Sequence, residues 1–305
     1  MAQIYKAKLM RKLIALLFIP ALLLSCGDDD TSGPTVQDLN VSINGLEDLG
    51  SAAQYEGWII VNEVPISTGT FTVDGMGNLS QTSFSVDANN LAGATKFVLT
   101  VEPIPDNDPA PSDQKLLAGD FAGSSATLST GVMPALGDFS NAAGTYFLRT
   151  PTDETGMNNG NDENGVWFGS PGMPPTANFT LPTLPVGWAY EGWVIGDSGP
   201  ISTGVFTEFG ARDSGNPFSG TENNAGPPIP GEDFFLNAPA GETFPLDIRG
   251  RTVVISVEPV PDNSPAPFLL KPLLANVAMD AATAPTAHDF GQNLGTIPTG
   301  TVTRQ

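Results

Sequence analysis

The sequence contains two copies of one long motif order. Three blocks occur twice and in the same order: residues 55–58 and 190–193 (Tyr-Glu-Gly-Trp), 65–69 and 200–204 (Pro-Ile-Ser-Thr-Gly), and 101–111 and 257–267 (a Val-Glu-Pro stretch rich in Pro and Asp). The first two pairs lie 135 positions apart and the third pair 156 apart, so the second copy has 21 additional residues between its blocks. Solenoid repeats have shorter periods, of about 20–50 residues. A long period with the motif order kept predicts a duplicated folding unit, and therefore two tandem domains.

The amino terminus has the pattern of an export signal. Four basic residues precede an apolar run at 13–24 and are the only charged side chains of residues 1–25: Lys6, Lys8, Arg11 and Lys12. An apolar run of that length is shorter than the roughly 20 residues that a membrane-spanning helix needs. Residues 1–25 are therefore predicted to be a cleaved signal peptide.

The signal ends in Leu23-Leu24-Ser25-Cys26, which resembles the lipobox of bacterial lipoproteins. The resemblance implies cleavage before Cys26 and a diacylglycerol on its sulfur, with palmitate-like chains in the membrane. Cys26 is the only cysteine, and an unpaired thiol in an exported protein would otherwise need an explanation. Two or more acyl chains anchor a protein stably, at about 0.8 kcal/mol per buried methylene. The alternative is an ordinary signal with an incidental cysteine.

Residues 26–36 follow as an acidic tether. The run Asp28-Asp29-Asp30 and its Gly, Ser and Pro neighbours offer no apolar surface to bury, so a flexible linker is expected. An aspartate run just after a lipidated cysteine also resembles the surface-export signals of some bacterial lipoproteins. A solvated spacer explains the run equally well, so the periplasmic and the surface face of an outer membrane both stay open.

The net charge excludes one class of partner. Beyond the signal, 8 basic residues stand against 33 acidic ones, a net charge of −25. Such a surface repels phosphate backbones, so nucleic-acid binding is not expected. No second cysteine is present to form an intramolecular disulfide, so packing alone must hold each domain.

Composition and patterning predict an all-β fold. Glycine (34) and proline (28) are abundant, and short alternating runs are separated by turn residues. We expect two antiparallel β-sandwich domains, immunoglobulin-like or similar, at residues 37–150 and 177–305. An Asn/Gly/Pro-rich linker at 151–176 should separate them, with an apolar island at 165–168 that docks on one domain.

The expected strands pair off between the two copies. They lie at 40–44, 55–61, 67–73, 96–102 and 116–121 in the first copy and at 178–181, 252–258 and 273–277 in the second, where the block 190–193 repeats residues 55–58. Prolines confine 178–181 to a sheet edge, and both faces of 55–61 are partly apolar, which favours a central strand. Beyond residue 277 the sequence shows little periodicity.

The duplicated central strand carries the candidate ligand-binding residues Glu56, Trp58, Glu191 and Trp193. Trp58 and Trp193 are predicted to be core residues, since each follows a glycine (Gly57 in the first copy) that lets a neighbouring ring approach the backbone. The alternative is a sugar-stacking platform shared with two further tryptophans, Trp167 and Trp188. Each glutamate is expected to pair with an arginine or to cap backbone amides, and a catalytic role is the less favoured interpretation.

These motifs together resemble the extracytoplasmic domain of anti-sigma-K-type factors. The resemblance is carried by Tyr-x-x-Trp, Pro-x-x-x-Gly-x-Phe and a strand closing on Glu-Pro. It covers about 52–121 and 187–277, and its positions are Tyr55, Trp58, Gly69, Phe71, Glu102, Pro103, Tyr190, Trp193, Gly204, Phe206, Glu258 and Pro259. It implies a sensory-type β-domain used twice. The family's cytoplasmic sigma-binding domain and transmembrane helix are not recognisable here, so direct sigma-factor binding is not expected.

Catalytic and transition-metal chemistry have few candidate residues. His288 is the only histidine, and no Gly-x-Ser-x-Gly elbow is present for a Ser-His-Asp arrangement. We expect His288 to be an exposed tail residue, and we predict a protein that is not an enzyme, with no cofactor and no dedicated metal site.

Calcium binding is the alternative from another functional class. Residues 101–109 resemble the strand-end calcium motif of cadherin repeats, whereas the second copy reads Asp262-Asn263-Ser264 and has one carboxylate fewer. The loop 153–165 is also acidic but lacks EF-hand spacing. The other interpretation of all these loops is turns capped by Asp and Asn.

The sequence thus predicts a non-enzymatic, lipid-anchored cell-envelope protein that binds or senses an envelope protein or glycan. The alternative is a calcium- or carbohydrate-binding surface adhesion module.

Overall fold

The computed structural model describes residues 35–155, 160–223, 226–262 and 264–305. The predicted signal peptide, Cys26 and nearly all of the predicted tether lie outside the described residues. The described part is almost entirely antiparallel β-sheet, with one α-helix, α1 (Ala88–Gly93), and the all-β prediction is confirmed. None of its helices is long and apolar enough to cross a membrane.

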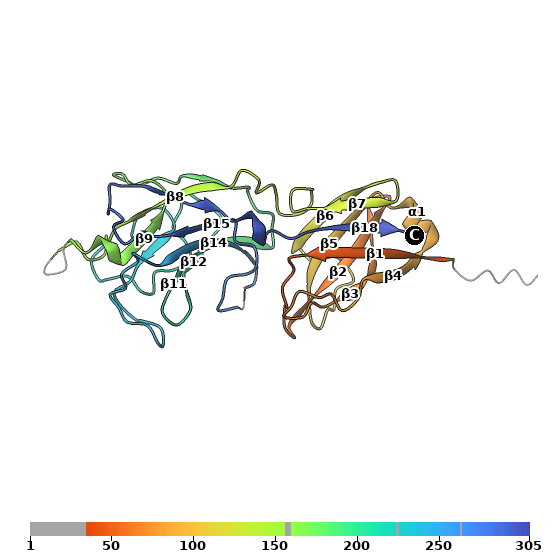
Figure 1. Cartoon of the computed structure of the whole chain (residues 1–305), viewed down its shortest axis with the longest axis horizontal. Helices are drawn as coiled ribbons and strands as arrows, with labels where there is room; N and C mark the ends of the chain where they lie inside the picture. The colour runs from red at the N-terminus through yellow and green to blue at the C-terminus, as the bar shows by residue number, and fades with distance from the viewer. Residues whose placement is uncertain (1–34, 156–159, 224–225, 263) are drawn as a thin grey trace, which may run out of the picture. The chain divides into compact units, whose positions relative to one another are not determined.

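Sheet one has eight strands in the order β3-β2-β5-β6-β7-β18-β1-β4 (Figure 1). Their bounds are β1 (Val36–Asn44), β2 (Ala53–Val61), β3 (Val64–Phe71), β4 (Ser83–Asp87), β5 (Lys96–Pro103), β6 (Lys115–Ala122), β7 (Ser125–Leu128) and β18 (Thr299–Arg304). The two ends of this order face each other, because the rings of Phe71 on β3 and Phe84 on β4 are 6.1 Å apart between centroids. Sheet one therefore curls around its own apolar core, as a sandwich does.

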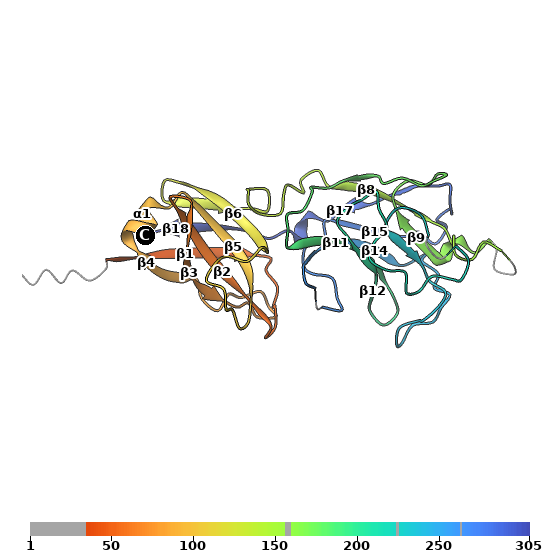
Figure 2. The same cartoon turned by 180° about the vertical axis from the view of Figure 1, so that it is seen from behind.

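Two further sheets are built from the middle of the chain (Figure 2). Sheet two has the order β12-β11-β14-β15-β17, and sheet three has the order β10-β8-β9-β13, with β16 also pairing β8. Their bounds are β8 (Ala143–Leu148), β9 (Gly165–Phe168), β10 (Phe179–Thr180), β11 (Trp188–Ile195), β12 (Pro200–Phe206), β13 (Gly231–Asp233), β14 (Thr252–Pro259), β15 (Leu273–Asn276), β16 (His288–Asp289) and β17 (Gly291–Gln292). The described residues also include the 3-10 turns η2 (Asp162–Asn164) and η3 (Leu294–Thr296). Sheets two and three pack face to face, because the Phe168 ring of β9 lies against Gly192 of β11.

The duplicated motif folds into the same four-stranded unit twice. The order β3-β2-β5-β6 in sheet one has its counterpart in β12-β11-β14-β15 in sheet two. In each unit the pairing register shifts at the same step, between Gly57 and Trp58 and between Gly192 and Trp193. The predicted central position of 55–61 is confirmed, since β2 lies between β3 and β5.

The expected close approach of a ring to the glycine is also confirmed. A Cβ on Gly57 would lie 2.8 Å from the Phe97 ring, and one on Gly192 would overlap the Phe168 ring. The β2–β3 hairpin is tighter than expected, because it turns on Asn62 and Glu63 alone, with φ of 48° and 67°. Two adjacent residues with positive φ are typical of a two-residue hairpin turn.

Three stretches differ from the sequence expectations. Residues 151–176, expected as a linker, contain β9, whose four residues are all buried between β8 and β13. β8 belongs to the range expected for the first domain but pairs within sheet three. Conversely, β18 belongs to the range expected for the second domain but pairs with β1 and β7 of sheet one. Strand pairing therefore does not follow the boundaries 37–150 and 177–305.

The carboxy-terminal stretch is also more ordered than its weak periodicity suggests. It supplies β16, β17 and β18, and Val302 of β18 is fully buried. The predicted edge position of 178–181 is confirmed, since β10 is a two-residue strand at the end of its sheet.

Candidate functional site

The polar residues of the duplicated motif form a buried hydrogen-bond chain in the first copy. The indole nitrogen Nε1 of Trp58 on β2 donates to the hydroxyl of Thr100 on β5 at 2.9 Å. The Thr100 hydroxyl in turn donates to Glu102, and the Ser67 hydroxyl on β3 donates to Glu56. Trp58, Thr100, Glu56 and Glu102 are all buried. Buried polar groups need such partners, and here the strands supply them to one another.

The second copy repeats this chain with serine in place of threonine. Trp193 Nε1 donates to the Ser256 hydroxyl at 2.8 Å, and that hydroxyl donates to Glu258. The Ser202 hydroxyl on β12 donates to Oε1 of Glu191. The same geometry arises twice because the three residue types recur at the same register positions of paired strands.

The glutamate of each Val-Glu-Pro segment also fastens the proline-rich loop that follows it. Oε1 of Glu102 accepts the backbone N–H of Ser112 at 2.9 Å. In the second copy, the Glu258 carboxylate accepts the N–H of Phe268 at 2.9 and 3.0 Å. Through these hydrogen bonds the glutamates hold the loop against the strand.

The four candidate residues of the duplicated strand are thus internal. Trp58 is 3% exposed and Trp193 2%, so the prediction that both are core residues is confirmed and neither ring is on the surface. Both glutamates accept from a serine hydroxyl, where an arginine or backbone amides were expected.

The two copies differ in how closely their carboxylates gather. In the second copy, one carboxylate oxygen each from Glu191, Glu258 and Asp262 lies within 4.8 Å of the others. Glu191 and Glu258 are buried and Asp262 is half-buried. Oε2 of Glu191 is buried and has no hydrogen-bond partner. Burial raises the pKa of Glu191 and of Glu258 to about 7 each, with the neighbouring carboxylates adding to the effect.

Three further carboxyl groups lie in the lengthened part of the second copy: Asp213 is half-buried, and Glu232 and Asp233 are buried. Burial raises the pKa of Asp213 to about 7, and the charge of Glu191 contributes. Burial likewise raises the pKa of Glu232 to about 8, with contributions from Asp233 and Asp213. Hydroxyls and backbone N–H groups supply their partners: Ser219 donates to Glu232, Thr152 to Asp233, and the Gly231 N–H to Asp213. No basic residue forms an ion pair with these three carboxyl groups within the described ranges.

Sequence reasoning missed Asp213, Glu232 and Asp233. They lie between residues 204 and 257, where the second copy is 21 residues longer than the first. The available signal is Glu232-Asp233 directly before Phe234-Phe235, an acidic pair within an apolar setting.

The His288 prediction is corrected. His288 is a half-buried member of β16, and its ring stacks on Tyr146 of β8 with 5.3 Å between centroids. Its Nε2 lies 2.8 Å from the carbonyl oxygen of Ala282. Neither contact joins it to a serine or to the carboxylate of Asp289.

The loops considered as calcium motifs are capped turns in both copies, since Oδ1 of Asp262 in the second copy accepts the N–H of Ser264 at 2.8 Å. Asp106 accepts the N–H of Asp108 at 2.9 Å, and Asp108 accepts the N–H of Ala110 at 3.0 Å. In the 153–165 loop, Glu154 pairs with Arg149 and Asp162 accepts from Thr150.

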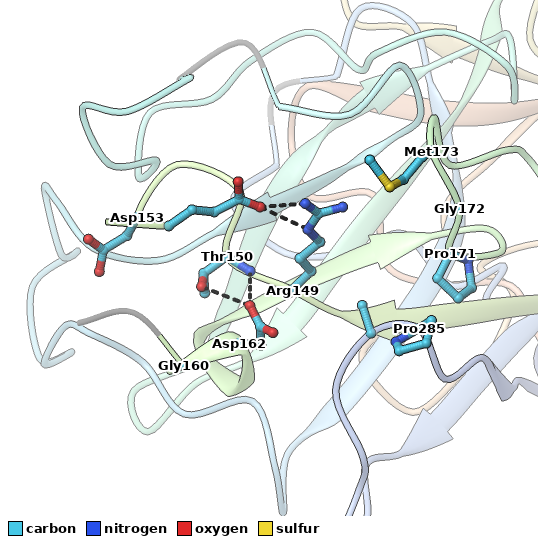
Figure 3. Close-up of a pocket in the computed structure, with 11 residues that line it drawn as sticks. Arg149, Thr150, Asp153, Gly160, Asp162, Pro171, Gly172, Met173 and Pro285 are labelled. Atoms are coloured by element: carbon cyan, nitrogen blue, oxygen red, sulfur yellow. Dashed lines mark hydrogen bonds and ion pairs between the residues drawn. The ribbon is translucent and has the colours of Figure 1, made fainter. Parts of the chain in front are cut away.

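Those last residues line a shallow polar cavity of about 470 Å³ (Figure 3). Figure 3 shows Asp162 directed at the backbone N–H and hydroxyl of Thr150. Nε of Arg149 lies 3.0 Å from Oε1 of Glu154. The charged groups of this cavity are therefore largely paired with its own wall, in contrast to the unpaired oxygen of Glu191.

Comparison with models of protein families gives no match. Comparisons with curated proteins and with solved structures give none either.

Proposed function

We propose that this chain is a non-enzymatic protein of the cell envelope, attached by lipid at Cys26, that binds or senses a partner through two copies of one β-unit. The observation that carries the proposal is the duplicated chain of buried hydrogen bonds. The residues that recur in both copies are used for internal contacts, such as Trp58 to Thr100 and Trp193 to Ser256. The tryptophans and their hydroxyl partners are thus accounted for as architecture, whereas Oε2 of Glu191 keeps no hydrogen-bond partner among the described residues.

The envelope location is supported by the sequence around Cys26. The basic region, the short apolar run and the lipobox-like end occur in the order that lipoprotein export requires. The extracytoplasmic domain of anti-sigma-K-type factors fits the same location, since that domain lies outside the cytoplasm. We propose that this chain shares the β-unit of that domain but does not contact a sigma factor directly.

The anchoring proposal is tested on the full chain expressed in a Gram-negative bacterium. We expect the protein in the outer-membrane fraction, with an amino-terminal peptide that begins at a lipid-modified Cys26 by mass spectrometry. Cys26→Ser should abolish the modification and shift the protein to the soluble fraction or leave it unprocessed. A mature start at another residue would rule out the anchor, and protease treatment of intact cells would report the face.

The non-enzymatic proposal is tested with the same protein on glycoside, ester and peptide substrates. We expect no turnover above that of a denatured control. Turnover abolished by Glu56→Gln or Glu191→Gln would overturn the proposal.

Calcium binding, one part of the alternative function, is favoured by one observation: the carboxylates of Glu191, Glu258 and Asp262 lie close together. The carbohydrate-stacking part is not favoured, because Trp58 and Trp193 are buried.

A further inference from the structure

Three carboxylates meet where the central strand of sheet two passes the proline-rich loop. Glu191 belongs to β11 and Glu258 to β14, and residues 191 and 256 are register partners on these neighbouring strands. Asp262 lies in the loop that leaves β14. One oxygen from each carboxylate lies within 4.8 Å of the others. Ca²⁺ holds its oxygen ligands at about 2.3–2.6 Å, so two ligands of one ion are at most about 5 Å apart. The spacing therefore permits the three oxygens to share one ion.

An independent observation marks the cluster as incomplete. Oε1 of Glu191 accepts from Ser202, but Oε2 is buried and has no hydrogen-bond partner. The Glu191 side chain as a whole is only 4% exposed. A buried polar atom without a partner costs about 1–3 kcal/mol, and more if it is charged. A cation beside Oε2 would remove that cost and would also offset the repulsion among the three carboxylates.

The surrounding charges leave the cluster negative. The charges of Glu47 and Glu258 counteract the lowering of the Lys271 pKa by burial, so Lys271 is a cation near this cluster. Its Nζ donates to the carbonyl oxygen of Phe268 at 2.6 Å. None of the ion pairs found in the described residues joins it to the three carboxylates. Asp213 adds a further acidic group on the side of Glu191.

We propose that Glu191, Glu258 and Asp262 form a binding site for a divalent cation, and that the cation is Ca²⁺. All three ligands are carboxylate oxygens, which suit hard cations, whereas Zn²⁺ sites are built mainly from cysteine and histidine. Ca²⁺ tolerates irregular geometry and takes six to eight oxygens, so water can complete its shell through the half-exposed Asp262 side. Mg²⁺ demands a near-ideal octahedron and gives up its water reluctantly, which suits this partly buried cluster less well.

The first copy supplies a matched control within the same chain. Glu56, Glu102 and Asp106 occupy the equivalent sequence positions. Burial raises the pKa of Glu56, and the charges of Glu102 and Asp106 contribute. In the described part of the chain, however, no oxygen of these three residues is both buried and without a partner. Nor do the three carboxylates gather as closely there as those of the second copy. The proposed site therefore belongs to the second copy alone. It does not depend on the lipid anchor.

The test is titration calorimetry of CaCl₂ into the detergent-solubilised full chain after EGTA treatment and buffer exchange at pH 7.5. Extracellular calcium modules bind with dissociation constants of about 10⁻⁴–10⁻³ M, so CaCl₂ is raised to about 10 mM. We expect one Ca²⁺ per chain and a rise in melting temperature. Glu191→Gln and Asp262→Asn should each weaken binding at least about tenfold, since a charged ligand is lost. Glu56→Gln should bind as wild type does, and MgCl₂ should bind more weakly than CaCl₂.

Asp262→Asn guards against a folding artefact, because Asp262 is half-buried and its variant keeps the side-chain shape. Circular dichroism of each variant without calcium confirms that the sheet is intact. Absence of both binding heat and a melting shift at about 10 mM CaCl₂ would overturn the proposal. So would unchanged binding in both Glu191→Gln and Asp262→Asn, or equal loss in Glu56→Gln.

Discussion

The indole nitrogen of Trp193 lies 2.8 Å from the hydroxyl oxygen of Ser256, and Trp58 and Thr100 make the same contact at 2.9 Å. Each hydroxyl passes the hydrogen bond on to a buried glutamate, Glu258 or Glu102. The tryptophan, the hydroxyl and the glutamate come from two adjacent strands, so the chain of bonds ties the centre of each four-stranded unit together. Removal of its middle member should leave the indole N–H without an acceptor and the glutamate with one donor fewer.

Ser256→Ala is therefore expected to cost more than the loss of one hydroxyl group. Trp193 Nε1 would lose its acceptor and Glu258 one of its donors, and buried groups without partners cost about 1–3 kcal/mol. Chemical denaturation followed by tryptophan fluorescence measures the change. Ser256→Thr, which restores the side chain found at position 100, should recover most of the stability. A loss of the same size in Ser256→Thr would show that packing rather than the hydrogen bond is responsible.

Trp193→Ala should destabilise the protein by about 3–5 kcal/mol, the usual cost of truncating a buried tryptophan. Trp58→Ala should have an effect of similar size, because both rings are almost fully buried. Calorimetry would distinguish two cases. If the units fold separately, each variant lowers one of two melting transitions; if they fold together, each variant shifts a single transition. Wild-type melting in both variants would contradict the assignment of these rings to the core.

Gly192→Ala should destabilise sheet two through overpacking. A Cβ there would overlap the Phe168 ring and the Thr203 hydroxyl, both of which are held in place by neighbouring strands. Overpacking of this kind costs about 1–3 kcal/mol. Gly75→Ala is the matched control, since a Cβ on Gly75 meets nothing within 4 Å. Equal melting temperatures for the two variants would disprove the close approach.

Stability in EGTA should rise as the pH falls from about 8 to about 5. Glu191, Asp213 and Glu258 have pKa values raised to about 7, and Glu232 to about 8. In the unfolded chain such groups titrate near 4. The folded state therefore binds more protons over this range, and by linkage the free energy of unfolding decreases as the pH rises. Melting temperatures at pH 5.5 and 8 measure the effect.

Glu232→Gln supplies the control for this pH dependence. The amide cannot ionise, so the fall in melting temperature between about pH 7 and 8 should become shallower. Glu208→Gln, at an exposed position, should leave the slope unchanged. A melting temperature that rises with pH over this range in wild type would contradict the assignment.

Deletion of residues 299–305, which contain β18, should unfold sheet one, although β18 is far along the chain from the other strands of that sheet. β18 fills the gap between β7 and β1, and its loss would leave two backbone edges unpaired. Val302→Ala is the milder variant, because Val302 is fully buried, and we expect a smaller loss, about 1–3 kcal/mol. Hydrogen exchange of β1 and β7 amides measures both effects. Unchanged protection after the deletion would show that β18 is dispensable.

The duplicated unit could be predicted from the sequence because its information is local and occurs twice. Alternating apolar residues define β2 and β5, and prolines end the second of them at Pro103. Gly57 indicated that a ring packs against the backbone, and Trp58 was predicted to be a core residue. The partners within the unit were not predicted, because a buried glutamate can accept from any nearby donor, and only the register of β2 against β3 brings Ser67 to Glu56.

The sequence by itself determined the all-β class, the two similar strand sets and the alternation that buries Trp58 and Trp193. Tertiary structure alone decided where β9 and β18 pair, because each is short, and its partners are selected by open backbone hydrogen bonds elsewhere in the fold. It also decided that Glu191, Glu258 and Asp262 meet. The pattern of a single strand fixes which face a side chain occupies, but the pairing of β11 with β14 and the path of the following loop bring these three carboxylates together.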